Sequence, residues 1–139
     1  MFRILVPVDG SENSSQAVRF LIKKAALYAQ PLEIQLLNVQ RPFPGTVRGV
    51  HEQAQQFHHD EGMQALAPAR ALLDEAALAY GYHIGLGEVG ETIAEYAKEK
   101  QIDQIVMATH GRGAIIGLLM GSVTRSVLHL TTVPVLLVR

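Results

Sequence analysis

The sequence of 139 residues contains no cysteine. This absence excludes a disulfide framework, a zinc site built from thiolates and a catalytic thiol. The G-x-S-x-G motif of hydrolases and the H-E-x-x-H motif of zinc proteases are also missing. We therefore predict no catalytic residue in this chain.

An excess of charge of one sign is absent as well. Twelve Lys and Arg residues stand against 13 Asp and Glu residues, which gives a formal net charge of -1. Binding to nucleic acid or to an anionic membrane surface needs a positive face. We therefore expect neither partner.

Long apolar runs are lacking too. No segment approaches the roughly 18 apolar residues of a membrane span. The apolar run before Asp9 is shorter than the apolar region of a secretory signal. We therefore expect a cytoplasmic protein.

The composition and length are those of a single globular domain. Apolar residues make up 48% of the chain and charged residues 18%, a mixture typical of globular proteins. The length predicts one domain over residues 1–139.

Short apolar segments alternate along the chain with segments of helical periodicity. Strict alternation of this kind predicts an α/β fold with a parallel sheet and helices on both faces. The predicted strands are Phe2 to Val8, Leu32 to Val39, His83 to Val89, Gln104 to Ala108 and Val133 to Val138. The predicted helices run from Ser11 or Ser14 to Pro31, and over Glu52 to Tyr80, Glu91 to Lys100 and Ser122 to Leu130.

Proline and glycine set the expected boundaries of the second helix. The segment 41–49 holds two prolines and two glycines and is predicted to be a loop. Gly81 is the expected residue just beyond the helix, where a left-handed conformation is common. Pro68 is expected to kink the helix or to split it in two.

Two polar, glycine-containing segments follow predicted strands one and four. Asp9-Gly10-Ser11 follows the first, and residues 109–122, which include Gly111, Gly113, Gly117 and Gly121, follow the fourth. In an open sheet of this type, ligands bind beyond the carboxyl ends of the strands where the winding reverses. If the first three strands wind one way and the last two wind the other, both segments border one crevice.

The second segment has the composition of a phosphate-binding turn. Glycine lets the backbone approach a ligand closely, and the first N–H groups of the helix that begins at Ser122 have no partner within the helix. Arg112 or Arg125 would add positive charge. The alternative is a glycine-rich surface loop that only caps a helix, because short glycine patterns often arise without a ligand.

Asp9 has two possible roles. A carboxylate beside a phosphate site can hold a sugar hydroxyl or a divalent metal that bridges to the phosphates. It can instead end the strand by accepting hydrogen bonds from nearby backbone N–H groups. We favour the role in ligand binding.

Two further patterns are weaker. Gly85 to Gly90 matches G-x-G-x-x-G, but these glycines lie inside a weak predicted strand rather than after a solid one, as a dinucleotide site requires. His51, His58, His59 and Asp60 are close in sequence. Adjacent histidines do not share one side of a helix, so we expect a solvated face rather than a metal site.

Four segments spread over the chain together resemble those of one known family. They are Val6-Pro-Val-Asp-Gly-Ser11, Thr109-His-Gly-Arg112, Gly121-Ser-Val-Thr-Arg-Ser-Val127 and Val133-Pro-Val-Leu-Leu-Val138. With them, the chain resembles the universal stress proteins over essentially its whole length. The resemblance implies an open five-stranded parallel sheet of order 3-2-1-4-5, Rossmann-like and of the adenine nucleotide alpha hydrolase type.

The ATP-binding branch of that family carries the pattern G-x2-G-x9-G-[S/T]. Here Gly111, Gly121 and Ser122 occupy the last three positions at the right spacing, and Ala108 replaces the first glycine. The resemblance therefore implies binding of ATP or another adenine nucleotide, with Mg²⁺ or Mn²⁺ held indirectly through Asp9. A methyl group at residue 108 is expected to weaken this binding if the strand end approaches the ribose.

The resemblance also implies the positions of the ligand and of a partner. Asp9 would lie near the ribose, Val39 against the adenine, and the turn before the last helix around the phosphates. The candidate site residues are Pro7, Val8, Asp9, Val39, Met107, Ala108, His110, Gly111, Arg112, Gly121, Ser122 and Val123. A homodimer is expected through the last strand, Val133 to Val138, since an apolar edge strand invites pairing.

These residues lead to a functional hypothesis and an alternative. The hypothesis is a stress-response module that binds ATP and switches its partners or its conformation, with at most slow ATP hydrolysis. The alternative is a nucleotide-free, dimeric interaction protein of the same family.

Overall fold

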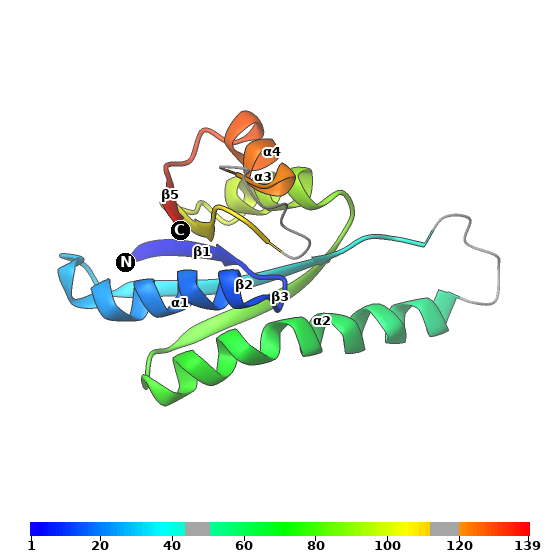
Figure 1. Cartoon of the computed structure of the whole chain (residues 1–139), viewed down its shortest axis with the longest axis horizontal. Coiled ribbons are helices and arrows are strands. Elements are labelled where there is room, and N and C mark those ends of the chain that lie inside the picture. Colours follow the sequence, from blue (N-terminus) through cyan, green and yellow to red (C-terminus); the bar gives the residue numbers. More distant parts are fainter. Residues whose placement is uncertain (44–50, 112–119) are drawn as a thin grey trace.

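The computed structural model describes residues 1–43, 51–111 and 120–139, and the side chain of His51 is not described (Figure 1). Arg112, one of the candidate site residues, lies outside these ranges. Five parallel strands form one sheet in the order β3-β2-β1-β4-β5. The strands are β1 Phe2–Pro7, β2 Leu32–Gln40, β3 Tyr80–Leu86, β4 Gln104–Ala108 and β5 Val135–Val138. The helices are α1 Glu12–Lys24, η1 Ala25–Leu27, α2 His51–Glu75, α3 Val89–Glu99 and α4 Ser122–Leu130. The predicted fold class and strand order are confirmed.

The two faces of the sheet carry separate hydrophobic cores because side chains alternate along each strand. Ile4 and Val6 of β1 pack against α1 and α2, together with Leu66 of α2. Leu5 faces the opposite side and packs with Ile93 of α3 and with residues of α4. Figure 1 shows the same arrangement, with α1 and α2 on one side of the sheet and α3 and α4 on the other.

The end of α2 differs from the prediction. The helix stops at Glu75 rather than at Tyr80, and Gly81 lies inside β3. Ala77 takes the left-handed conformation (φ 55°), and the amide of Leu78 donates to the carbonyl of Leu73 at 3.1 Å. A residue in this conformation ends a helix, and it is usually a glycine. Because the residue here is alanine, the sequence did not indicate that α2 ends at Glu75.

The structure also bears on two other expectations in this region. Pro68 lies inside α2, which continues through it to Glu75, so the helix is not split in two and a kink at Pro68 stays a prediction. The buried side chain of His58 contacts the rings of Phe43 and Phe57, with ring centroids 4.9 and 5.7 Å away. His58 therefore does not belong to a solvated face.

The sheet opens between β1 and β4 at its carboxyl edge. β1 pairs with β2 over all six of its residues, but with β4 only at Ile4 and Leu5. The last residue of β1 is Pro7, which has no N–H to donate. The chains that leave β1 and β4 therefore part, at the point where the winding of the sheet reverses direction.

Candidate functional site

A cleft of about 430 Å³ lies at this opening, between the carboxyl ends of β1, β2 and β4 and the first turns of α3 and α4. The candidate residues that line it are Pro7, Val8, Asp9, Val39, Met107, Ala108, His110, Gly111, Gly121, Ser122 and Val123. Every candidate residue that the structure describes thus lies in one place. The topology of the sheet brings together three distant parts of the sequence, which are residues 7–9, residue 39 and residues 107–111 together with 121–123.

One wall of the cleft is apolar. Leu37 and Val39 from β2 share it with Met107 from β4 and with Val89 and Ile93 from the start of α3. These side chains belong to the core on the α3 and α4 side of the sheet. Such a wall suits a flat, apolar ring system, which gains free energy when it leaves water.

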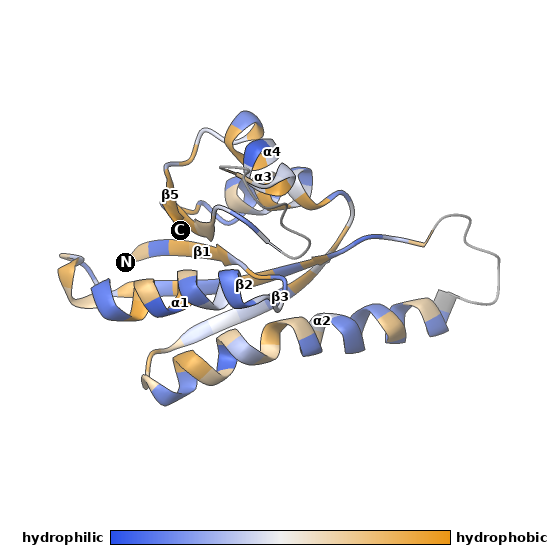
Figure 2. Ribbon diagram, in the orientation of Figure 1, coloured by the Kyte–Doolittle hydropathy of each residue, from blue (hydrophilic) through white to orange (hydrophobic). Residues whose placement is uncertain are grey.

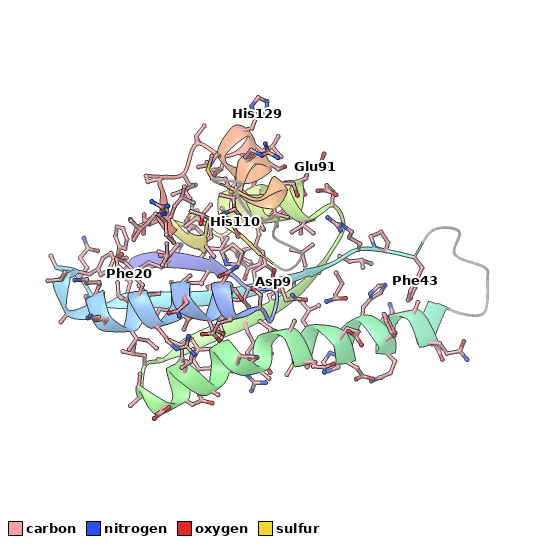
Figure 3. The ribbon with its side chains drawn as sticks, in the orientation of Figure 1. Asp9, Phe20, Phe43, Glu91, His110 and His129 are labelled. Atoms are coloured by element: carbon pink, nitrogen blue, oxygen red, sulfur yellow. The ribbon has the colours of Figure 1, made fainter. Side chains whose placement is uncertain are left out.

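Asp9 stands at the boundary between this wall and the polar side. Its Oδ1 accepts a hydrogen bond from the amide of Ser11 at 2.9 Å. Its Oδ2 faces Gly111, where a Cβ atom would lie only 2.5 Å from that oxygen. The carboxylate thus ends the strand in part through backbone bonding, and it also approaches the chain that leaves β4. Figure 3 shows Asp9 and His110 in the middle of the molecule, near the ends of β1 and β4.

The polar side is formed by the N-terminus of α4. Gly121 is the N-cap residue, with φ −74° and ψ 167°. Its amide donates to the carbonyl of Thr109 at 2.6 Å, so this amide is engaged within the protein. The amides of Ser122 and Val123, the first two of the helix, remain as the donors that α4 directs outward. They lie at the positive end of the helix dipole.

Thr124 connects the end of β4 to this helix, and His110 lies beside it in the cleft. Thr124 is buried, and its Oγ1 donates to the carbonyl of Ala108 at 3.0 Å and to that of Thr109 at 3.3 Å. His110 lines the cleft, and within the described ranges its buried Nδ1 atom has no hydrogen-bond partner.

Several residues that line the cleft were not predicted from the sequence. Ser14, Asn38, Arg41 and Thr124 line the cleft, as do Leu37, Val89 and Ile93 of the apolar wall. Asn38 carried one usable signal, since it is a polar side chain within the apolar segment Leu36 to Val39. The others are ordinary core or helix residues in sequence, and only the fold places them here. Arg125, considered above for its charge, also lines the cleft.

The weaker patterns do not form sites in the described part of the chain. Gly85 lies within β3, Gly87 turns the chain with φ 150°, and Gly90 packs against Ser126 of α4. None of these glycines lines the cleft. The described residues contain no group of three or more His, Cys, Asp or Glu side chains able to hold a metal, and none of their helices has the length and apolar character to cross a membrane.

Comparison with known proteins extends over the whole chain. The family model described as the universal stress protein family matches residues 1–139. Universal stress protein MJ0531 of Methanocaldococcus jannaschii is 30% identical over 139 residues, which cover 99% of this chain and 81% of that protein. The universal stress protein UspA from Lactobacillus plantarum has a similar structure, with a TM-score of 0.84 at 23% identity over 99% of this chain and 97% of that one.

Three similar structures hold nucleotides. They are a universal stress protein in complex with cAMP (TM-score 0.72, 24% identity, 99% of this chain and 97% of that one), a family protein from Arabidopsis thaliana with AMP bound (0.71, 18%, 99% and 91%), and a universal stress protein from Archaeoglobus fulgidus in complex with dAMP (0.66, 20%, 100% and 98%). At these identities the likeness shows the shared fold.

Proposed function

Because this chain belongs to the universal stress protein family, we propose that it binds ATP or another adenine nucleotide in the cleft between β1 and β4. The bound nucleotide would control its conformation or its choice of partner during a stress response. Nucleotide complexes of similar proteins, with cAMP, AMP and dAMP, support this proposal.

The observation that carries the proposal is the glycine at the start of α4. Gly121 has a negative φ, which any residue can adopt. A Cβ atom there would come no closer than 3.6 Å to the rest of the described protein, an ordinary contact. Neither its backbone conformation nor its packing against the described residues therefore demands glycine, and a ligand that approaches the backbone provides the reason for one.

The two sides of the cleft suggest how the nucleotide lies. The base would pack on the apolar wall, near Val39 and Met107. The ribose hydroxyls would donate to Asp9, and the phosphates would accept hydrogen bonds from the amides of Ser122 and Val123. Arg125, one turn into α4, would add a positive charge near the phosphates.

A divalent metal would depend mainly on the nucleotide. Asp9 is the only carboxylate among the described residues that line the cleft, and one of its oxygens already accepts the amide of Ser11. Mg²⁺ commonly binds through one carboxylate, the phosphates and water, so this residue set fits Mg²⁺ or Mn²⁺ only as a companion of the phosphates. The metal would neutralise phosphate charge.

We propose that the chain is a binding protein rather than an enzyme. Rapid phosphoryl transfer needs a group that orients the attacking water and a cation that stabilises the transition state. The described cleft offers a single carboxylate, Asp9, on the side assigned to the ribose. Hydrolysis of ATP would therefore be slow at most.

We also propose that two copies pair through β5, in the cytoplasm. β5, Val135–Val138, is the last strand of the sheet, and among the described strands it pairs only with β4. All four of its residues are apolar and only partly buried. An exposed apolar edge of this kind is suited to pairing with a second copy.

Analysis of the purified protein tests nucleotide binding. Mass spectrometry of the denatured protein should detect ATP, ADP or AMP that co-purifies. Calorimetric titration of protein stripped of ligand should then show saturable binding of ATP. Ala108, at the position of a family glycine, is the observation that favours the nucleotide-free alternative. A clean protein that ignores added ATP would establish that alternative and contradict our proposal.

A further inference from the structure

The peptide group that joins Val8 to Asp9 is held at both ends by buried side chains. Its carbonyl oxygen, that of Val8, accepts a hydrogen bond from Nδ2 of Asn38 at 2.9 Å. Its N–H, that of Asp9, donates to Oγ of Ser14 at 3.4 Å. Asn38 is 4% exposed and Ser14 is 5% exposed, and both also line the cleft.

Neighbouring bonds fix the orientation of each of these side chains. Gln40 donates through Nε2 to Oδ1 of Asn38 at 2.7 Å, which leaves the Nδ2 group of Asn38 directed at Val8. The hydroxyl of Ser14 donates to the carbonyl of Ser11 at 3.0 Å, so its lone pairs are available to the amide of Asp9. Each end of the peptide group therefore has one defined partner.

The position of this peptide group, together with the bond from the Ser11 amide to Oδ1, sets where the Asp9 carboxylate lies. The group directly precedes the Cα atom of Asp9, and β1 has already ended at Pro7. Past that point the ladder bond from the amide of Val8 to the carbonyl of Leu37, at 2.9 Å, still ties the chain to β2. The next peptide group takes its two partners from the side chains of Asn38 and Ser14 rather than from a neighbouring strand.

We infer that Asn38 and Ser14 are positioning residues for the nucleotide site, which act through the Val8–Asp9 peptide group to direct the Asp9 carboxylate toward the ribose hydroxyls. This inference rests on the proposed function. A buried amide in an apolar strand needs a polar partner, and here that partner is the backbone beside the ligand-binding carboxylate. Asn38 belongs to β2 and Ser14 to α1, so these two elements meet at the peptide group that follows β1.

Comparison of ATP with 2′,3′-dideoxy-ATP tests this role, because the second ligand lacks the hydroxyls that Asp9 would bind. By calorimetry, the wild-type protein should bind ATP on the order of 10-fold more tightly than the dideoxy analogue, the effect of a hydrogen bond to a charged group. In Asn38→Leu this preference should fall to less than about threefold, mainly through weaker binding of ATP. A purely structural role would weaken the binding of both ligands equally.

Ser14→Ala provides a second variant in case Asn38→Leu does not fold. It should reduce the same preference, and Ser15→Ala serves as its control. Ser15 is the next residue of α1 and is 4% exposed, so it matches Ser14 in burial, but its side chain has no described bond to the Val8–Asp9 peptide. The control should retain the wild-type preference.

The outcomes separate this inference from the proposed function. Equal binding of ATP and the dideoxy analogue by the wild-type protein would overturn the inference and leave nucleotide binding intact. An unchanged preference in Asn38→Leu and Ser14→Ala, or an equal loss for both ligands, would overturn it as well. Absence of ATP binding by the wild-type protein would overturn the proposed function itself.

Discussion

Helices α1 and α4 begin in the same way but serve different ends. The N-cap of α1 is Ser11, with φ −75° and ψ 159°, and the N-cap of α4 is Gly121, with φ −74° and ψ 167°. Ser11 accepts the amide of Ser14 through its side chain at 3.2 Å. Gly121 has no side chain with which to do the same. Because the two N-cap residues have nearly the same backbone conformation, the two helix starts differ in the side chain of the N-cap residue.

This difference separates a structural helix start from one suited to a ligand. The serine satisfies one of the first amides of α1 from within the protein, as a capping residue usually does. The glycine leaves the first amides of α4 for an outside partner, next to a cleft. Both helices start at the same edge of the sheet, so position alone does not distinguish them.

Replacement of the glycine should have the largest effect. In Gly121→Val, the branched side chain would stand where the phosphates approach the first amides of α4. We expect ATP binding to weaken by at least about 100-fold in calorimetry. The free energy of unfolding should fall by only about 1 kcal/mol, the cost of a poor capping residue. Wild-type affinity in this variant would show that α4 does not bind the phosphates.

Gly121→Ala provides a graded control for this result. Its Cβ atom would meet the carbonyl oxygen of Thr109 at an ordinary 3.6 Å. The variant should fold, and its affinity for ATP should lie between those of the wild-type protein and Gly121→Val. If Gly121→Ala bound ATP more weakly than Gly121→Val, an explanation based on the size of the side chain would be contradicted.

Removal of the serine cap should have a smaller effect, and it should lower the stability of the protein rather than its affinity for ATP. In Ser11→Ala, α1 loses the bond to the amide of Ser14, and the free energy of unfolding should fall by about 1 kcal/mol. Chemical denaturation measures this loss. Affinity for ATP should stay within about threefold of the wild-type value, because the bond that Ser11 makes to Asp9 uses its backbone amide. If Ser11→Ala lost much of its affinity for ATP without losing stability, the N-terminus of α1 would serve ligand binding as we expect of α4, and the two helix starts would not differ in function.

The central strands could be predicted because a buried strand appears in the sequence as a short run of apolar residues. β1 and β4 are short apolar segments, and they were placed to within one residue of their bounds. β3 was displaced by three residues, since it is an edge strand with only one fully buried residue, Gly85. Figure 2 shows β1 mostly in the hydrophobic colour, whereas the first half of β3 is pale.

The site was predictable only in part, for a similar reason. Asp9 and Gly121 follow strands whose order brings them together, so topology alone located them. The positions of Ser14, Asn38 and Ile93 in the cleft depend on neighbours that are distant in sequence, and a single sequence contains no record of those contacts. The engagement of the Gly121 amide by Thr109 also depends on the path of the chain in space.

The smallest expected effect concerns the one departure from the family's glycine pattern, on the same side of the cleft as α4. Ala108 ends β4, is 9% exposed and lines the cleft. Removal of its methyl group in Ala108→Gly should leave affinity for ATP unchanged or improve it by up to about threefold. Glycine in a strand should lower the free energy of unfolding by about 0.5–1 kcal/mol, which thermal denaturation would reveal. A marked loss of affinity would mean that the methyl group contacts the nucleotide favourably, and that alanine here contributes to binding rather than limits it.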